Sequence, residues 1–201
     1  MRKVIVTNIV TPDGYFEGPG KDFLAMPEED AFDEYNAERL RAADTLVLGR
    51  LTYEGANAYW PGVADDPTAP AGLREMSRLI NAMDKVVVSD SLTPERTAPW
   101  HDTRIVGRGA AHEAVAGLRR SPGRDILIFG SHVLWNDLLA HGLVDELHLM
   151  IGPKVLGGGT PAFELPAPVS LRLLDARPLP YSQLVLIRYG VASSARPMGA
   201  G

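Results

Sequence analysis

The sequence contains no cysteine among its 201 residues. Disulfide bonds, thiolate metal ligands and a cysteine nucleophile are therefore excluded. No apolar run approaches the roughly 18 residues that a membrane-spanning helix needs. Residues 1–10 alternate like a strand and lack the apolar core and cleavage site of a signal peptide. We therefore expect a soluble, cytoplasmic protein with no membrane partner.

Basic residues are scarce as well, since 20 Lys and Arg stand against 25 Asp and Glu and give a formal net charge of −5. They are scattered along the chain, whereas nucleic-acid surfaces concentrate basic side chains in a stripe or patch. The sequence therefore predicts no nucleic-acid partner and leaves a small molecule as the expected substrate.

Two further classes of site lack their usual patterns. The five histidines show neither H-x-x-x-H nor H-E-x-x-H spacing. We therefore predict no metal site and expect most histidines at the surface or at helix ends. No serine lies in a G-x-S-x-G turn, which leaves nucleophilic hydrolysis without support.

What the chain does contain is an alternation of strand-like and helix-like segments. Segments 45–48, 84–89 and 125–129 are apolar on both faces, as strands inside a parallel sheet are. Segments 169–176 and 183–189 have the pattern of a closing hairpin. Helices are expected at 28–43, after Gly49-Arg50 with Thr52 in the first turn, and at 72–83, 110–120 and 131–141. This order predicts an α/β fold with a mostly parallel sheet and an antiparallel C-terminal hairpin.

The length fits one domain, which we place at residues 1–190, followed by a disordered tail of small residues at 191–201. The turn Pro12-Asp13-Gly14 leads into a Gly/Pro loop at 15–21 that is long enough to move. A second exposed loop is expected at 61–70, where prolines lie at both ends.

Three of the expected strands end on residues suited to a phosphate, namely Gly49-Arg50, Ser89-Asp90-Ser91 and Gly130-Ser131. Open α/β sheets bind ligands at the carboxyl ends of their strands, and helix N-termini offer free N–H groups to phosphates. Each end alone has an ordinary explanation, such as a tight turn at Gly49 or an N-cap by Ser131. Because the pattern recurs, we favour a nucleotide site.

A carboxylate on the first expected helix is a candidate proton donor. Asp33 follows Phe32 by one step around the helix, so it lies at the edge of the apolar face. A partly desolvated carboxylate there has a raised pKa and can deliver a proton. The alternative is that the acids of this first turn are simply solvated.

Taken together, these motifs resemble the dihydrofolate reductase superfamily, and especially the reductase domain of the bacterial riboflavin-biosynthesis deaminase/reductase. Their order and spacing match from about residue 2 to residue 190. The segments that carry the likeness are VTPDGY (10–15), DTLVLGRLTYE (44–54), KVVVSDSL (85–92), DILIFGSHVL (125–134), LVDELHL (143–149) and PKVLGGGTPAF (153–163).

The resemblance implies a three-layer fold, an NADPH-dependent reductase and, often, a homodimer. It places the cofactor phosphates on Gly49, Arg50 and Thr52, and the adenosine 2′-phosphate near Ser89. The pyrophosphate side would be held by Gly130, Ser131, Val133 and Leu134. Thr11, Asp13 and Gly14 would line a mobile loop over the nicotinamide, and the spacing back from Gly49 assigns the catalytic carboxylate to Asp33.

Two departures from the family pattern bear on which cofactor and which type of reductase we expect. Asp90 stands where many relatives have a basic residue, and its charge repels a 2′-phosphate, so NADH remains possible beside NADPH. The W-x-L-P-x-acid signature of folate reductases is reduced to Met26-Pro27-Glu28-Glu29, which argues against a folate reductase. No deaminase segment is present either, so we expect a stand-alone reductase.

We therefore expect hydride transfer from NADPH to a C=N or C=O bond of a small, heterocyclic substrate related to pterins, pyrimidines, flavins or secondary metabolites. Asp33 or a bound water would supply the proton. Two alternatives stay open. One is a repurposed fold that catalyses a non-redox cyclisation or isomerisation, and the other is a module that only binds a pterin or flavin.

Overall fold

The computed structural model describes residues 1–20, 22 and 29–192. Of the predicted tail at 191–201, only the first two residues are among those described. Lys21 of the predicted mobile loop and Met26-Pro27-Glu28 of the shortened signature also lie outside the described residues. Among the described residues, no helix is long and apolar enough to span a membrane.

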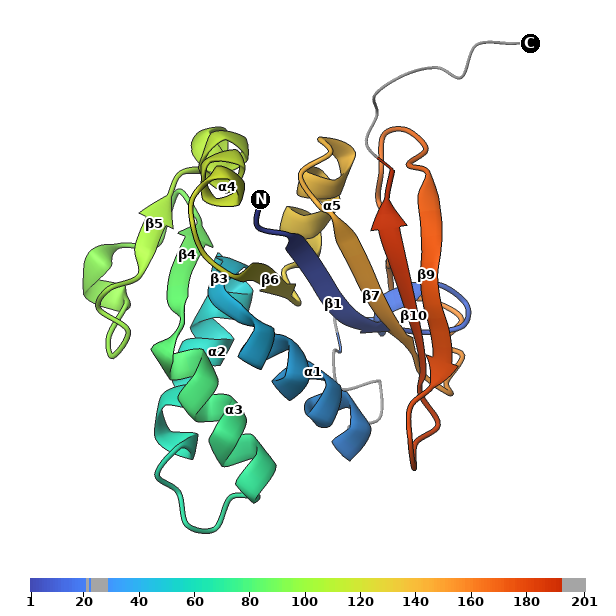
Figure 1. Cartoon of the computed structure of the whole chain (residues 1–201), viewed down its shortest axis with the longest axis horizontal. Helices are drawn as coiled ribbons and strands as arrows, with labels where there is room; N and C mark the ends of the chain where they lie inside the picture. The colour runs from blue at the N-terminus through green and yellow to red at the C-terminus, as the bar shows by residue number, and fades with distance from the viewer. Residues whose placement is uncertain (21, 23–28, 193–201) are drawn as a thin grey trace.

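An eight-stranded sheet runs through the centre of the molecule (Figure 1). Its strands lie in the order β5 (Arg104–Val106), β4 (Asp84–Val88), β3 (Ala43–Gly49), β6 (Asp125–Phe129), β1 (Val4–Val10), β7 (Glu146–Ile151), β10 (Val185–Val191) and β9 (Leu171–Pro178). The strands from β5 to β7 pair in parallel, while β10 is antiparallel to both β7 and β9. The predicted fold class is confirmed.

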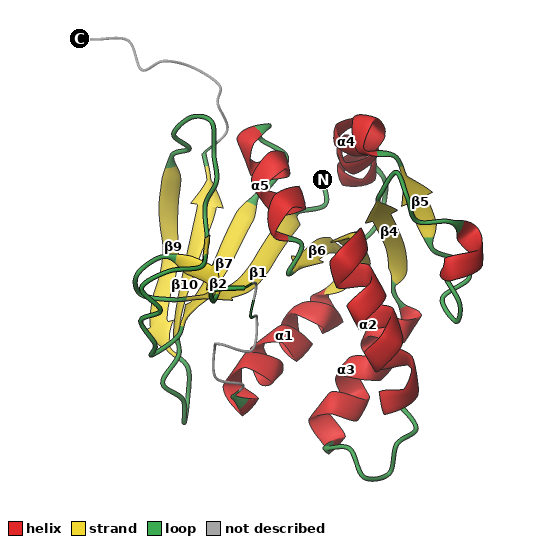
Figure 2. Ribbon diagram, turned by 180° about the vertical axis from the view of Figure 1, so that it is seen from behind, coloured by secondary structure: helices red, strands yellow, loops and turns green. Residues whose placement is uncertain are grey.

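Helices cover both faces of this sheet (Figure 2). α1 (Asp30–Ala42), α2 (Arg50–Val63) and α3 (Ala71–Ala82) pack on one face, and α4 (Ala111–Arg120) and α5 (His132–Ala140) on the other. Alternation along β3 shows how one strand serves both layers. Leu46 and Leu48 join the core under α1 to α3, whereas Val47 joins the core under α4 and α5.

Two expected loops are partly regular structure. The segment predicted as a mobile loop contains β2 (Tyr15–Glu17), which pairs with β8 (Thr160–Pro161). The loop expected from Pro61 begins later, because α2 continues through this proline to Val63. A proline removes one helical hydrogen bond and crowds the preceding turn, and α2 ends two residues after Pro61.

Candidate functional site

The strands β3 and β6 are neighbours in the sheet, and the helices that follow them leave toward opposite faces. α2 follows β3 into one layer, and α5 follows β6 into the other (Figure 2). In open α/β sheets, a point where the helices after two neighbouring strands go to opposite faces is called a topological switch point. Ligands bind in the crevice that such a point forms beyond the carboxyl ends of the strands.

Four residues at this point, which we call the strand-end cluster, are Gly49, Thr52, Gly130 and Ser131. The N–H of Gly49 donates to Oγ of Ser131 (3.0 Å), and the N–H of Ser131 donates to Oγ1 of Thr52 (2.9 Å). These reciprocal hydrogen bonds join the end of β3 to the end of β6. The two strand ends predicted to share a ligand are therefore in direct contact.

Asn8 of β1 supports the cluster from the third strand and was missed by the sequence analysis. Its Oδ1 accepts from the N–H of Gly130 (2.8 Å), and its side chain is 4 % exposed. A buried asparagine inside an apolar strand needs a partner. That rule is the signal that would have singled out Asn8 in the sequence.

The backbone of the cluster is unusual at Gly130 and Ser131, whose φ angles are +52° and +51°. A Cβ added to Gly130 would lie 3.0 Å from Cγ2 of Thr52, so any larger residue would press on Thr52 as well as adopt a conformation that favours glycine. Ser131 is held in a conformation that L-residues rarely adopt. Ser131 occupies the N-cap position of α5 as expected, but its hydroxyl makes no capping bond to the helix and instead accepts from the N–H of Gly49.

The first turns of both α2 and α5 lack a side-chain cap, and neither has an acidic residue. Uncapped N–H groups at a helix N-terminus, together with the helix dipole, attract anions. Two such N-termini meet at the strand-end cluster, because Gly49 and Ser131 are the residues that precede the helices. This arrangement suits a ligand that carries two linked phosphates.

Arg50, the first residue of α2, lies beside this N-terminus. Its guanidinium pairs with Glu54 one turn along the helix (2.8 Å), and Glu54 also pairs with Arg96 (2.5 Å). Because Glu54 retains Arg96, Arg50 can turn toward a phosphate without leaving the carboxylate unpaired.

The end of β4 is built differently. Oγ of Ser89 accepts from the N–H groups of Ser91 and Leu92 (3.1 and 2.9 Å), so this hydroxyl closes a local turn. Asp90 accepts from the N–H of Arg108 (2.8 Å), and both side chains are exposed. Ser89 therefore lies at a strand end as predicted, with an acid and a base beside it.

The loop after β1 is anchored to the glycine-rich segment before β8. Asp13 accepts from the N–H groups of Leu156 and Gly157, and the carbonyl of Gly14 accepts from Ala162. Hydrogen bonds from Thr11 and then from Gly157 lower the pKa of Asp13. Thr11, Asp13 and Gly14 thus belong to one turn at the carboxyl end of β1, and hydrogen bonds to the glycine-rich segment hold this turn in place.

Two residues predicted to bind the cofactor, Val133 and Leu134, lie on α5 outside the strand-end cluster. Val133 is 77 % exposed on the first turn of α5, whereas Leu134 is 8 % exposed and packs in the core. The side chain of Leu134 therefore belongs to the packing of α5 against the sheet and does not join the strand-end cluster.

Asp33 lies half-buried in the first turn of α1. α1 ends directly before β3 begins, so its N-terminal turn lies toward the carboxyl edge of the sheet. Thr7 of β1 donates to Asn36 one turn further along (3.0 Å), which fixes α1 over β1. Asp33 therefore lies at the same edge of the sheet as the strand-end cluster.

A buried polar chain beneath α1 was not anticipated, and His148 in this chain is an exception to the expectation that most histidines lie at the surface or at helix ends. His148 of β7 is fully buried between Tyr35 and Glu146, at 2.8 Å from each. Burial lowers the pKa of His148 to about 4. Burial alone would raise the pKa of Glu146, but hydrogen bonds from Lys3, His148 and Arg188 outweigh it and lower this pKa to about 2. His132 is also buried, and its Nε2 lies 2.7 Å from the carbonyl oxygen of Pro161.

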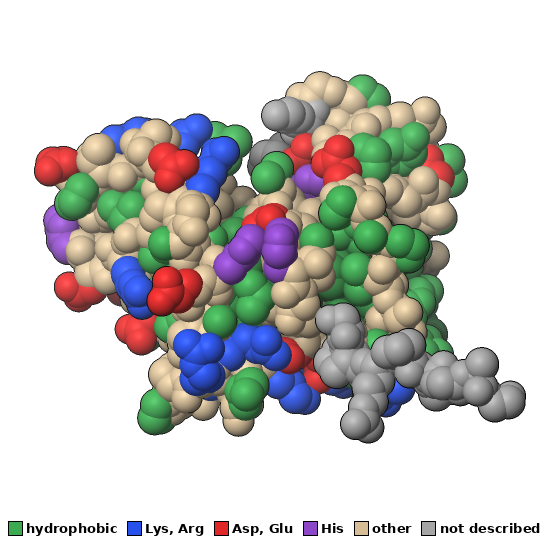
Figure 3. All heavy atoms as spheres, turned by 90° about the horizontal axis from the view of Figure 1, so that it is seen from above, with side chains coloured by type: hydrophobic (Ala, Val, Ile, Leu, Met, Phe, Trp, Pro, Cys, Tyr) green, Lys and Arg blue, Asp and Glu red, His purple; other side chains and the backbone are tan. Residues whose placement is uncertain are grey.

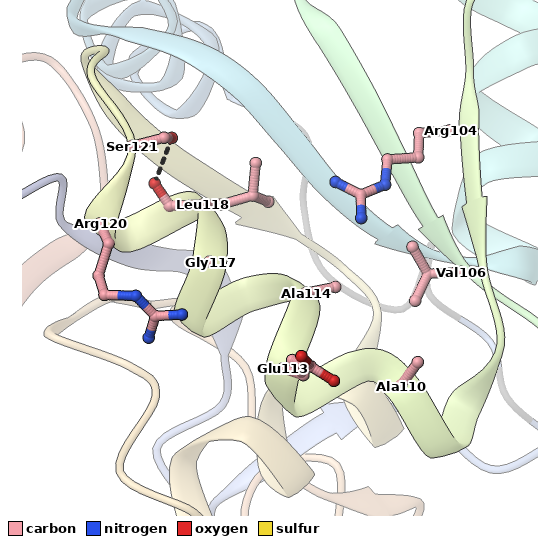
Figure 4. Close-up of a pocket in the computed structure, with 9 residues that line it drawn as sticks. All are labelled: Arg104, Val106, Ala110, Glu113, Ala114, Gly117, Leu118, Arg120 and Ser121. Atoms are coloured by element: carbon pink, nitrogen blue, oxygen red, sulfur yellow. Dashed lines mark hydrogen bonds between the residues drawn. The ribbon is translucent and has the colours of Figure 1, made fainter.

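A separate hollow of about 390 Å³ lies between α4 and the edge strand β5 (Figure 4). Charged side chains at its rim include Arg104, Glu113 and Arg120, and the floor is small or apolar. No member of the strand-end cluster lines it, so it is distinct from that cluster.

Comparison with known proteins agrees with this architecture. The uncharacterised protein YyaP of Bacillus subtilis is 29% identical over 180 residues, which cover 88% of each chain. Among solved structures, a pyrimidine reductase-like protein from Corynebacterium diphtheriae superposes with a TM-score of 0.65 at 18% identity, covering 95% of this chain and 92% of that one. Dihydrofolate reductase from Enterococcus faecalis, complexed with NADP(H), gives a TM-score of 0.55 at 14% identity, covering 94% and 96%.

These structural likenesses establish a dihydrofolate-reductase-like fold. A family model described as the RibD C-terminal domain matches residues 2–185, which is most of the chain. The protein therefore belongs to the RibD C-terminal domain family.

Proposed function

We propose that this chain is an NADPH-dependent reductase that transfers a hydride to a C=N or C=O bond of a small heterocyclic substrate related to pterins, pyrimidines or flavins. The observation that carries the proposal is the meeting of two uncapped helix N-termini at the strand-end cluster. Membership of a reductase family supports it, as does the similarity in fold to a reductase complexed with NADP(H).

The residues present fit a dinucleotide. The absence of a side chain at Gly130 lets Thr52 of α2 lie close to the end of β6, and the N–H groups that open α2 and α5 would bind the pyrophosphate. Arg50 would exchange Glu54 for a phosphate. The bound cofactor would supply the hydride.

On the substrate side, this chain would orient the reactants and deliver a proton. Thr11, Asp13 and Gly14 would line the nicotinamide end, where their turn excludes water. Asp33 would protonate the reduced atom, directly or through a water, from its place over the carboxyl edge of the sheet. Asp90 would disfavour a 2′-phosphate, so NADH competes with NADPH.

Calorimetric titration with NADPH and NADH tests the proposal. We expect one dinucleotide per chain and at least tenfold weaker binding by Arg50→Gln. Arg41→Gln is the matched control, because Arg41 also pairs with a glutamate, Glu75, but lies at the amino edge of the sheet. If the wild type binds neither dinucleotide, the proposal is wrong.

A further inference from the structure

α4 and the end of α5 bring together three side chains that take no part in the strand-end cluster, namely His112, Asp137 and His141. One possible ligand atom from each lies within 4.8 Å of the other two. Figure 3, which looks down on these helices from above, shows histidine side chains gathered beside an acidic one. Because His112 is 25 residues from Asp137, sequence spacing could not reveal the group.

The geometry within the group already approaches that of a metal site. Nε2 of His112 lies 2.7 Å from Oδ2 of Asp137, and the two imidazole rings are 4.0 Å apart between centroids. In a tetrahedral zinc site with bonds of about 2.0–2.1 Å, neighbouring ligand atoms lie about 3.4 Å apart. Side-chain rotation closes the remaining difference, since all three side chains are 43–53% exposed.

One hydrogen bond prepares His141 as a ligand. Its Nδ1 lies 2.8 Å from the carbonyl oxygen of Asp137, one turn earlier in α5. Donation from Nδ1–H to this carbonyl leaves Nε2 unprotonated and fixes the ring, as backbone carbonyls do for many histidines that bind metals. The group thus offers two imidazole nitrogens and one carboxylate.

We propose that His112, Asp137 and His141 bind one divalent transition-metal ion of the zinc class, with water completing its coordination. Imidazole ligands favour Zn²⁺, Ni²⁺ and Cu²⁺ over Mg²⁺ and Ca²⁺, which prefer oxygen. The bound ion links α4 to the end of α5 and stabilises the folded state. This site is independent of dinucleotide binding.

Calorimetric titration of the untagged protein with ZnCl₂ tests the inference. We expect one ion per chain, at least tenfold weaker binding by His112→Ala and by His141→Ala, and unchanged binding by His101→Ala, which removes an exposed histidine outside the group. Zn²⁺ should raise the Tm of the wild type and of His101→Ala but not of the other two variants. Absence of Zn²⁺ binding, or equal affinity in all four proteins, would overturn the inference.

Discussion

Replacing Ser131 by alanine and by glycine separates the two unusual features of this residue. Both substitutions remove the hydroxyl that accepts from the N–H of Gly49 at 3.0 Å. Only glycine also relieves the backbone, since φ at this position is +51°. The two variants therefore share one loss and differ in the other.

The magnitudes predict a reversal of the usual order, in which alanine stabilises a chain relative to glycine. Loss of the hydrogen bond costs about 1 kcal/mol in either variant. The left-handed conformation costs an L-residue about 1.5 kcal/mol, and the glycine variant is relieved of this cost. Glycine also makes the unfolded chain more flexible, which lowers the stability of that variant by about 0.5 kcal/mol. Ser131→Gly should therefore be more stable than Ser131→Ala by about 1 kcal/mol and nearly equal to the wild type.

Urea unfolding followed by circular dichroism measures these differences. Both variants should bind NADPH more weakly than the wild type, because both remove one of the two hydrogen bonds that join the ends of β3 and β6. If Ser131→Ala proves as stable as Ser131→Gly, the conformation assigned to this residue stores no strain and the reasoning is refuted.

Three further outcomes are expected. Gly130→Ala should lower the free energy of unfolding by about 2–4 kcal/mol, because a left-handed alanine would also press on Thr52. Gly142→Ala is the control, because Gly142 has a φ of +66° but open space around the added methyl group. Its free energy of unfolding in urea should fall by only about 1–2 kcal/mol. Equal losses in the two variants would contradict the close approach of Gly130 to Thr52. Burial lowers the pKa of His148 to about 4 in the folded protein, whereas an ordinary histidine has a pKa of 6.5. The unfolded chain therefore binds more protons between these two values, and stability falls as the pH is lowered from 6.5 to 4. The loss should reach up to about 3 kcal/mol, and His148→Gln should flatten the slope of unfolding free energy against pH; an unchanged slope would remove His148 as its cause. Asp90→Asn keeps an acceptor for the N–H of Arg108 but removes the negative charge. The affinity for NADPH should therefore rise about two- to fivefold, with no gain in affinity for NADH. Equal gains for both dinucleotides would show that Asp90 does not face the 2′-phosphate.

Strand positions were the most predictable part of the fold, because buried strands are recognisable from local composition. The bounds of β6 agree with the expected segment 125–129, and β4 ends one residue before the expected segment 84–89 does. The helix through Pro61 could not be predicted in the same way. A proline inside a helical pattern predicts a helix end at the preceding residue, and α2 is an exception to this rule.

The strand ends could be predicted, but their connection could not. Glycine and serine after an apolar run indicate a turn, and parallel strands place such turns at one edge. The hydrogen bonds between Ser131, Gly49 and Thr52 depend on β3 and β6 being neighbours, although 82 residues separate Ser131 from Gly49. The same reason hid the pairing of His148 with Tyr35, which are 113 residues apart.

Hydrogen exchange with and without NADPH is the most direct test of the proposed site, because it reports which amides the ligand protects. The account predicts slower exchange in peptides that contain residues 49–52 and 130–131, where the two uncapped helix N-termini meet. Peptides from residues 113–121, which line the separate hollow, should be unchanged. Protection confined to the hollow, or no protection at saturating NADPH, would contradict the assignment of the dinucleotide to the strand-end cluster.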